Sequence, residues 1–326
     1  MSDNTDNTLQ PQAPPQGPTQ AQILAKMPAL LGGYPSTTLD LPLSAVLIAI
    51  FASLAATNVT LFIRNKKRGL FFPLNMVTFG FCMARITTFT LRIVWSKHIF
   101  HRDVSTVAQI MVAAGVVLLY IVNMVLTKRL LDSRHPRVGR NIGVRVLFKL
   151  YYASLIVILA LVIKAVVYRF GGKTLSSSDK TVMKLGPIWF TVFAFLPLPL
   201  STLIALTRST RTTPLGTPAD RATKWQKVAL ICAASFFLTL GASIRAGINF
   251  LPARLNSNPA WYHHRAVFYV FLPVVEICAV LVFVAGRMDR KFYVPKTVVE
   301  TKEGESMESL QEKEGVREGG RESDSV

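Results

Sequence analysis

Apolar residues along this 326-residue chain fall into blocks of about 20 residues, separated by short basic stretches. A helix rises about 1.5 Å per residue and the hydrocarbon core of a bilayer is about 30 Å thick, so each block can cross a membrane. Backbone groups in lipid must be hydrogen-bonded within their own segment, which favours helices. We therefore expect an all-α integral membrane bundle of seven transmembrane helices, with spans at about 43–63, 71–95, 104–127, 146–168, 185–206, 227–248 and 266–286.

Prolines predict irregular geometry in two of these spans. The fifth carries Pro187, Pro197 and Pro199, and the seventh carries Pro273. Proline has no backbone N–H and its ring collides with the preceding turn. We expect the fifth span to be kinked or broken and the seventh to bend at Pro273.

The polar ends of the chain differ from the membrane region. Residues 1–31 are rich in Pro and Gln and are expected to be disordered or interfacial, with a short interfacial helix between Ile23 and Leu31. They lack the basic start and short apolar core of a cleaved signal peptide, so the first span would act as an uncleaved signal-anchor. Residues 32–296 form the membrane domain, and residues 297–326 form an acidic, disordered tail.

The charge distribution predicts an orientation. The net charge is +19, although residues 297–326 alone carry about −5. Alternate loops divide the basic residues into 19 on the side of the C-terminus and 9 on the side of the N-terminus. The positive-inside rule then puts the N-terminus outside and the C-terminus in the cytoplasm. The membrane itself is expected to be the plasma membrane or an endomembrane. Because the basic residues adjoin apolar blocks, we expect them to contact anionic lipids of the bilayer and not nucleic acid.

Charged side chains inside the spans mark the first candidate site. A charge at mid-membrane costs about 3 kcal/mol or more to insert, so it should face the bundle interior and have a partner. Arg85 and Glu276 lie at similar depth in the second and seventh spans, which predicts an ion pair, and Arg92 follows two turns after Arg85. This intramembrane polar site has two interpretations. It is either a structural ion pair that fixes how the second span meets the seventh, or a site that binds a substrate or a proton.

A second candidate is an outer basic vestibule. Lys164 and Arg245 should lie near the outer ends of their spans, and His263 and His264 follow in the last outer loop. Together they would suit an anionic head group or a small anion. The alternative is ordinary snorkelling of long side chains to the interface.

Other chemistry is not indicated. The histidine pair has no accompanying cluster of ligands, and the three cysteines are scattered through apolar blocks, so no metal or cofactor is expected. The last span has no lysine for a retinal Schiff base, and no phosphate-binding loop or hydrolase motif is present. We do not expect an enzyme.

Several motifs carry a resemblance to a known family. They are GGYPSTTLDLPLSAV (32–46), GFCMARITTFTLRI (80–93), AQIMVAAGVVLLYIVN (108–123), FLPLP (195–199), LGASIRAGINF (240–250), PAWYHHRAVFYVFLPVVEI (259–277) and GRMDRKFYVP (286–295). In these stretches the chain resembles a fungal family of multi-span membrane proteins catalogued only as a domain of unknown function. Its layout is also similar to fungal lipid-translocating, toxin-resistance proteins with seven spans, which implies lipid or toxin handling.

Two functional classes remain open at this point. One is transport or lipid and toxin handling through the polar bundle core. The other is a receptor-like sensor that signals through the basic cytoplasmic loops. The ligand and the oligomeric state are left open.

Overall fold

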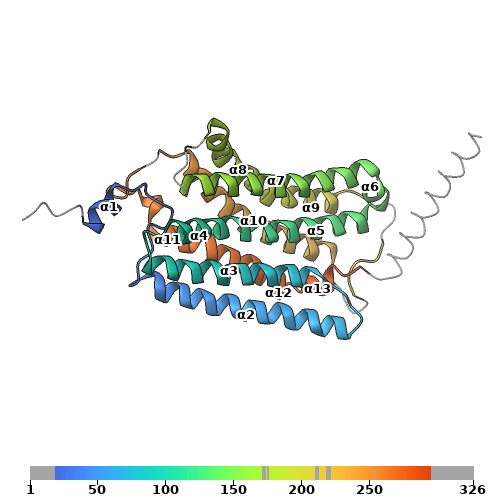
Figure 1. Ribbon diagram of the computed structural model, residues 1–326. Helices are drawn as coiled ribbons and strands as arrows, with labels where there is room; N and C mark the ends of the chain where they lie inside the picture. Colours follow the sequence, from blue (N-terminus) through green and yellow to red (C-terminus); the bar gives the residue numbers. More distant parts are fainter. Residues whose placement is uncertain are drawn as a thin grey trace, which may run out of the picture.

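The computed structural model describes residues 19–170, 174, 176–209, 213–217, 222–252 and 254–294. Within these residues the chain is helical, and seven segments are long and apolar enough to cross a membrane (Figure 1). The chain is thus an all-α multi-pass membrane protein, as the apolar blocks predict. The expected disorder of residues 1–18 and 297–326 lies outside the described residues.

Four of the seven spans are built around a single long helix. These are α2 (Asp40–Lys67), α3 (Leu74–Lys97), α7 (Ile142–Phe170) and α10 (Lys224–Phe250). The other three are composite: α4 (Arg102–Gly115) with α5 (Val117–Arg134), α8 (Ser177–Phe195) with α9 (Pro197–Leu206), and α11 (Arg265–Tyr269) with a π-helical turn (Val270–Val274) and α12 (Val275–Ala285). Short helices α1 (Gln20–Lys26), α6 (Pro136–Arg140) and α13 (Met288–Lys291) lie at the ends of the bundle (Figure 1).

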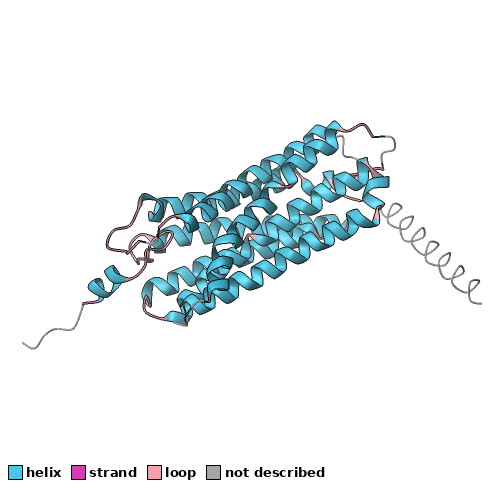
Figure 2. Ribbon diagram, turned by 90° about the horizontal axis from the view of Figure 1, so that it is seen from above, coloured by secondary structure: helices cyan, strands magenta, loops and turns pink. Residues whose placement is uncertain are grey.

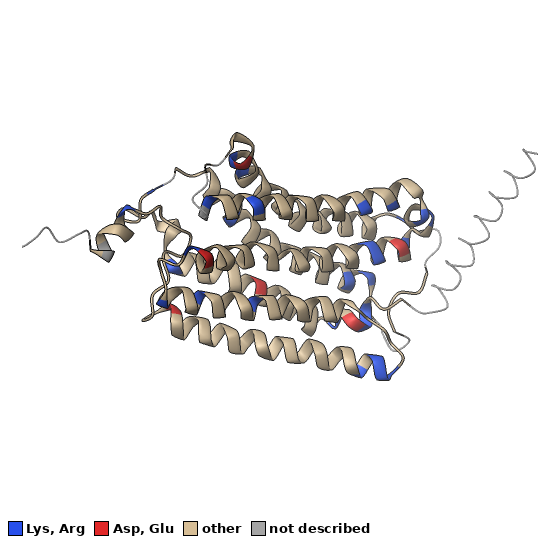
Figure 3. Cartoon of the chain, in the orientation of Figure 1, with Lys and Arg blue, Asp and Glu red and all other residues tan. Residues whose placement is uncertain are grey.

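The spans form one elongated bundle, seen from a second direction in Figure 2. Helix α10 packs against α5, α8, α9 and α12, so it occupies a central position, while α2 packs on α3 and α12. We call the end where α2 begins and α10 ends the N-terminal face. The opposite end, which carries α6 and α13, is the C-terminal face. Lys and Arg gather toward both ends, with a few charged positions between them (Figure 3).

The predicted break in the fifth span is confirmed, and the seventh span is irregular at its proline. The fifth span breaks at Leu196, directly before Pro197, while Pro187 is accommodated inside α8. In the seventh span Pro273 lies within the π-helical turn, which ends one residue before α12 and two before Glu276. A single wide turn of this kind rotates the side chains that follow it, so it helps to set the direction of Glu276.

The third span contains a break that the sequence analysis did not predict. Helix α4 ends at Gly115, and α5 begins at Val117. No proline lies nearby. A Cβ at Gly115 would approach the Arg85 guanidinium at 3.3 Å, so the glycine makes room for a charged side chain from α3.

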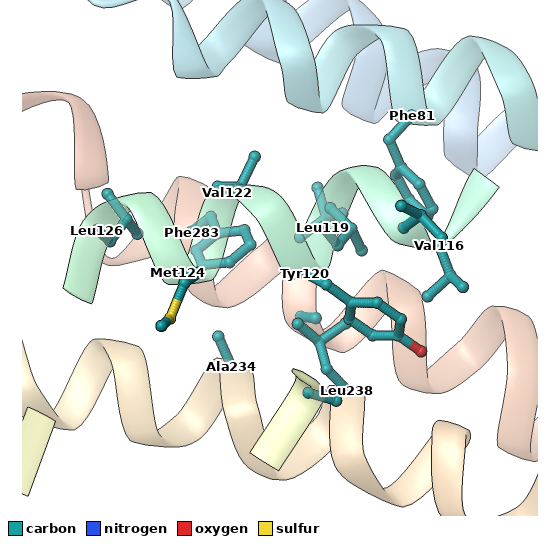
Figure 4. Close-up of a cluster of buried hydrophobic side chains, with 14 of the residues drawn as sticks. Phe81, Val116, Leu119, Tyr120, Val122, Met124, Leu126, Ala234, Leu238 and Phe283 are labelled. Atoms are coloured by element: carbon teal, nitrogen blue, oxygen red, sulfur yellow. The ribbon is translucent and has the colours of Figure 1, made fainter. Parts of the chain in front are cut away.

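The half of the core nearer the C-terminal face is filled by apolar side chains. Leu119, Val122, Leu126 and Phe283 are fully buried, and Figure 4 shows them on α5 and α12 beside residues of α10. In contrast, α7 exposes most of its apolar surface, as expected for a helix that faces lipid. The interior at this level is therefore filled largely by apolar side chains.

Residues 19–39, which we call the N-terminal strap, are folded onto the N-terminal face. Helix α1 is shorter and earlier than the expected interfacial helix and ends before Pro28. Pro28 and Leu255 form an isolated antiparallel bridge, and the Ala29 amide donates to the Arg254 carbonyl at 2.8 Å. The strap is thus held by main-chain hydrogen bonds to the loop that follows α10.

Candidate functional site

An ion pair joins the second and seventh spans at mid-membrane, as their charges predict. Arg85 Nη2 donates to Glu276 Oε1 at 2.6 Å, and Arg85 Nε lies 2.6 Å from Glu276 Oε2. Both side chains are almost completely buried. Only the Nη2–Oε1 contact has hydrogen-bond geometry, since Nε and Oε2 are close but make no hydrogen bond, so the pair combines one charge-assisted hydrogen bond with a close ionic contact.

Glu276 has a second arginine partner, which the sequence analysis placed elsewhere. Arg245 of α10 donates from Nη2 to Glu276 Oε1 at 2.8 Å. The sequence pattern predicts Arg245 only in the outer vestibule. Its side chain reaches the central carboxylate because α10 lies close to the seventh span: a hypothetical Cβ at Gly241 would lie 3.0 Å from the Phe271 carbonyl oxygen in the π-helical turn. Two guanidinium groups therefore share one carboxylate, and the cluster carries a net charge of about +1.

Carbonyl groups at the end of α4 complete this cluster. Arg85 Nη1 donates to the carbonyls of Met111 and Val112 at 3.3 and 3.2 Å, and Arg245 Nη1 donates to Val112 at 3.3 Å. The C-terminal end of a helix carries a partial negative charge, which favours nearby cations. The break after Gly115 thus supplies acceptors to both arginines.

Arg92 does not belong to the Glu276 site, which corrects the expected grouping. It donates from Nη2 to Asp40 Oδ1 at 2.8 Å, and Tyr269 donates from its hydroxyl to the same oxygen at 2.7 Å. Arg265 lies 3.4 Å from the other Asp40 oxygen. The expected first span began at residue 43, so Asp40 was left out, whereas α2 begins at Asp40.

This second cluster also fixes the strap. Arg92 Nη2 donates to the Gly32 carbonyl at 3.1 Å, and the Ser36 amide donates to Asp40 Oδ2 at 2.9 Å. Arg265 Nη2 donates to the Tyr34 carbonyl at 3.3 Å. The Arg92–Asp40 pair therefore couples the strap to the start of α2 and the end of α3.

A cavity of about 340 Å³ occupies the half of the bundle nearer the N-terminal face. Its walls are apolar side chains of α4, α7, α8 and α10, and strap residues Pro28 to Leu31 line it as well. The deepest lining residue on α5 is Tyr120, one turn before Asn123. Asn123 Nδ2 donates to Ser235 Oγ at 2.7 Å and so ties α5 to α10 beyond that level.

The polar lining of the cavity is basic. Arg169, Arg245, Arg254 and His263 contribute to it, and none of the described residues that line it is acidic. The Arg245 side chain is 18% exposed, in contrast to Arg85 at 3%. Arg245 thus brings the positive charge of the central cluster to the cavity surface.

The predicted outer vestibule is only partly formed. Arg245 and His263 line the cavity, but Lys164 forms an ion pair with Asp179 at 3.2 Å instead. His264 is also excluded, since its Nδ1 accepts from the Ala266 amide at the start of α11. Lys164 lies on a different face of α7, which is directed toward the first turn of α8.

His263 is held in its neutral form. The Ala260 amide donates to its Nδ1 at 3.3 Å, which requires an unprotonated nitrogen. Burial lowers the pKa of the His263 imidazole from its ordinary value, and the nearby Arg254 cation lowers this pKa further. At neutral pH the positive charge of the lining therefore comes from arginine.

Several contributors to these clusters were not predicted as site residues. Asp40, Tyr269 and Arg265 surround Arg92, while Tyr120 and Arg169 line the cavity. Asp40 could have been found from its position, because an acid three residues before an expected span often belongs to the first helical turn. Nothing in the sequence marks Tyr120, which is an ordinary aromatic in an apolar run.

The comparison with protein families confirms part of the resemblance. A profile of the family described as protein of unknown function (DUF3112) matches residues 208–293, about a quarter of the chain. The matched stretch contains Arg245, His263, His264 and Glu276. Among the curated proteins and the solved structures, none matches this chain. Similarity over the earlier motifs, and a fungal origin, stay predictions.

Proposed function

We propose that this multi-pass membrane protein transports or otherwise handles a small amphiphilic molecule, such as a single-chain lipid or a toxin, through its bundle core. The observation that carries this proposal is the cavity, which connects the N-terminal face to the buried arginine–glutamate cluster. Its volume of about 340 Å³ is at the lower end of the range for ligand sites. No catalytic step is assigned to it.

The basic bias of the loops supports a direction for this function. If the C-terminal face lies in the cytoplasm, the cavity opens toward the outside or the lumen. The basic C-terminal face would then contact anionic lipids of the cytoplasmic leaflet. A ligand would enter past the strap and stop at the level of Tyr120.

Flux through the purified full-length protein in liposomes tests the proposal. Entrapped radiolabelled decanesulfonate and a fluorescent phospholipid quenched from outside give two separate readouts. Ala113→Trp fills the cavity and should abolish flux, because Ala113 lines it. The matched control is Ala153→Trp, whose position on α7 is exposed outside the bundle. Flux equal to that of protein-free liposomes, or flux unaffected by Ala113→Trp, would refute transport through this cavity.

One observation favours the receptor-like alternative. The core beyond Tyr120 is filled by buried apolar side chains, so the lining reaches only part of the way across the bundle (Figure 4). A receptor needs no continuous path. Binding of decanesulfonate without flux, together with changed amide exchange in α6 and residues 213–217, would favour this alternative.

A further inference from the structure

Tyr120 presents an unused hydrogen-bonding group to the cavity. Tyr120 lines the cavity and is 1% exposed, and its hydroxyl makes no hydrogen bond within the described part of the chain. In Figure 4 the hydroxyl lies at the Val116 end of α5, directed away from Phe283 and Met124. The hydroxyl oxygen is not fully enclosed by protein atoms, so a water molecule or a ligand in the cavity can reach it and complete its hydrogen bonding.

Arg245 leaves donors unused at the same level. A guanidinium has about five N–H groups. The Arg245 side chain uses Nη1 for Val112 and Nη2 for Glu276, which leaves a second N–H on each of these two nitrogens, while its Nε is buried without a partner among the described residues. Donor capacity is therefore in excess, and the nearest acid is already shared with Arg85.

The electrostatic balance points the same way. Two arginines and one glutamate leave about one positive charge in the middle of the membrane, where a charge is expensive to hold. The α4 carbonyls offset part of this charge through their dipoles. They are neutral groups, so they leave the net charge unchanged. A bound anion would neutralise it.

We propose that Tyr120 and Arg245 form the head-group site of this cavity for a compact anionic group, such as a carboxylate, sulfonate or phosphate, on a single apolar chain. The inference rests on the proposed function and specifies its ligand class. The Tyr120 hydroxyl and Arg245 hold the anion, and the apolar walls, including Val162, Val166 and Phe190, hold the chain. The cavity volume of about 340 Å³ is roughly eleven times the 30 Å³ or so that one water molecule occupies. If each carbon of the chain takes about as much space as a water molecule, the cavity suits a single chain of about ten carbons and not a two-chain phospholipid.

Binding to the full-length protein in nanodiscs, with empty nanodiscs as the background, tests the head-group preference. The probes share one chain length and differ in charge: decanesulfonate, decanol and decyltrimethylammonium. Inorganic sulfate supplies the head group alone. We expect decanesulfonate to bind at least tenfold more tightly than decanol and the cation, and sulfate to bind at least tenfold more weakly. Equal affinity for decanol and decanesulfonate would overturn the anionic site, and sulfate binding as tight as decanesulfonate would overturn the amphiphile.

Variants assign the preference to the two residues. Tyr120→Phe removes only the hydroxyl and should weaken decanesulfonate binding by about fivefold to tenfold while leaving decanol unchanged. Arg245→Gln should abolish the preference for the anion, and Arg245→Lys should restore part of it if Arg245→Gln folds poorly. Lys164→Gln is the matched control, since Lys164 pairs with Asp179 in the same half of the bundle and does not line the cavity. Anion selectivity that survives Tyr120→Phe and both Arg245 variants refutes this assignment.

The two proposals fail separately. Selective binding of the anion without flux would support the head-group site and refute transport. Flux that is abolished by Ala113→Trp would support transport. If the same protein does not distinguish decanesulfonate from decanol, the head-group site is refuted.

Discussion

Arg245 and Arg85 approach the same carboxylate from two different helices. Arg245 Nη2 and Arg85 Nη2 lie 2.8 and 2.6 Å from Glu276 Oε1. Glu276 thus connects α3, α10 and α12 at mid-membrane. The sequence predicts a pair between two spans, whereas the structure contains a triad of three, and the stability of the bundle depends unequally on its members.

Loss of Glu276 should cost more stability than loss of Arg85. Glu276→Gln leaves two buried arginines without an acid, for which we expect a loss of about 3–5 kcal/mol. Arg85→Met leaves Glu276 paired with Arg245 and removes the excess charge, so we expect about 1–3 kcal/mol. Thermal unfolding midpoints in detergent measure the order. If Arg85→Met is the more damaging change, the carboxylate is not shared as the structure indicates.

Locking the strap should close the cavity. Pro28 and Leu255 oppose each other in an antiparallel bridge, where Cβ atoms are about 4.5–5.5 Å apart, close to the spacing a disulfide needs. The double variant Pro28→Cys/Leu255→Cys should exchange decanesulfonate slowly when oxidised and normally after reduction. Each single cysteine variant serves as a control. Exchange that is equally fast in the oxidised protein would show that the ligand does not pass the strap.

Two adjacent glycines in the strap should differ in their response to alanine. Gly32 and Gly33 both have positive φ, +80° and +63°, which costs a non-glycine residue about 1–2 kcal/mol. A Cβ at Gly33 meets open space, but one at Gly32 would lie 2.6 Å from Cβ of Phe268. Gly32→Ala should therefore also displace the carbonyl that accepts from Arg92. Amide exchange of the strap should rise much more in Gly32→Ala than in Gly33→Ala, and similar exchange in both would contradict the packing.

Acid should destabilise the protein through His263. Its folded-state pKa is lowered, so the unfolded chain takes up a proton first as the pH falls. Stability should thus decrease from about pH 6.5 down to the folded-state pKa. Relative to His263→Gln, the wild-type unfolding midpoint should fall over this window. His98→Gln, an exposed histidine of the same face, is the control, and parallel pH curves for wild type and His263→Gln would refute the shift.

The sequence by itself determined the seven spans, the break before Pro197, the irregular turn at Pro273 and the common depth of Arg85 and Glu276. These features depend on local composition and on helix geometry, because membrane thickness sets how long an apolar segment must be. An unpaired charge in the hydrocarbon core has a high free energy, so an arginine and an acid at the same depth are expected to form an ion pair.

Only the tertiary structure decided which face each helix turns inward. In the folded protein Arg245 pairs with Glu276 as well as lining the cavity, and Arg92 pairs with Asp40. Lys164 pairs with Asp179. Residues of the strap line the cavity. Other contacts at the strap and at Asp40 join residues as far apart as Arg265 and Tyr34, or Tyr269 and Asp40. All of these contacts depend on the rotation of each helix about its own axis. Apart from Glu276, α12 is uniformly apolar and has no amphipathic stripe to fix that rotation, so packing against the neighbouring helices sets it.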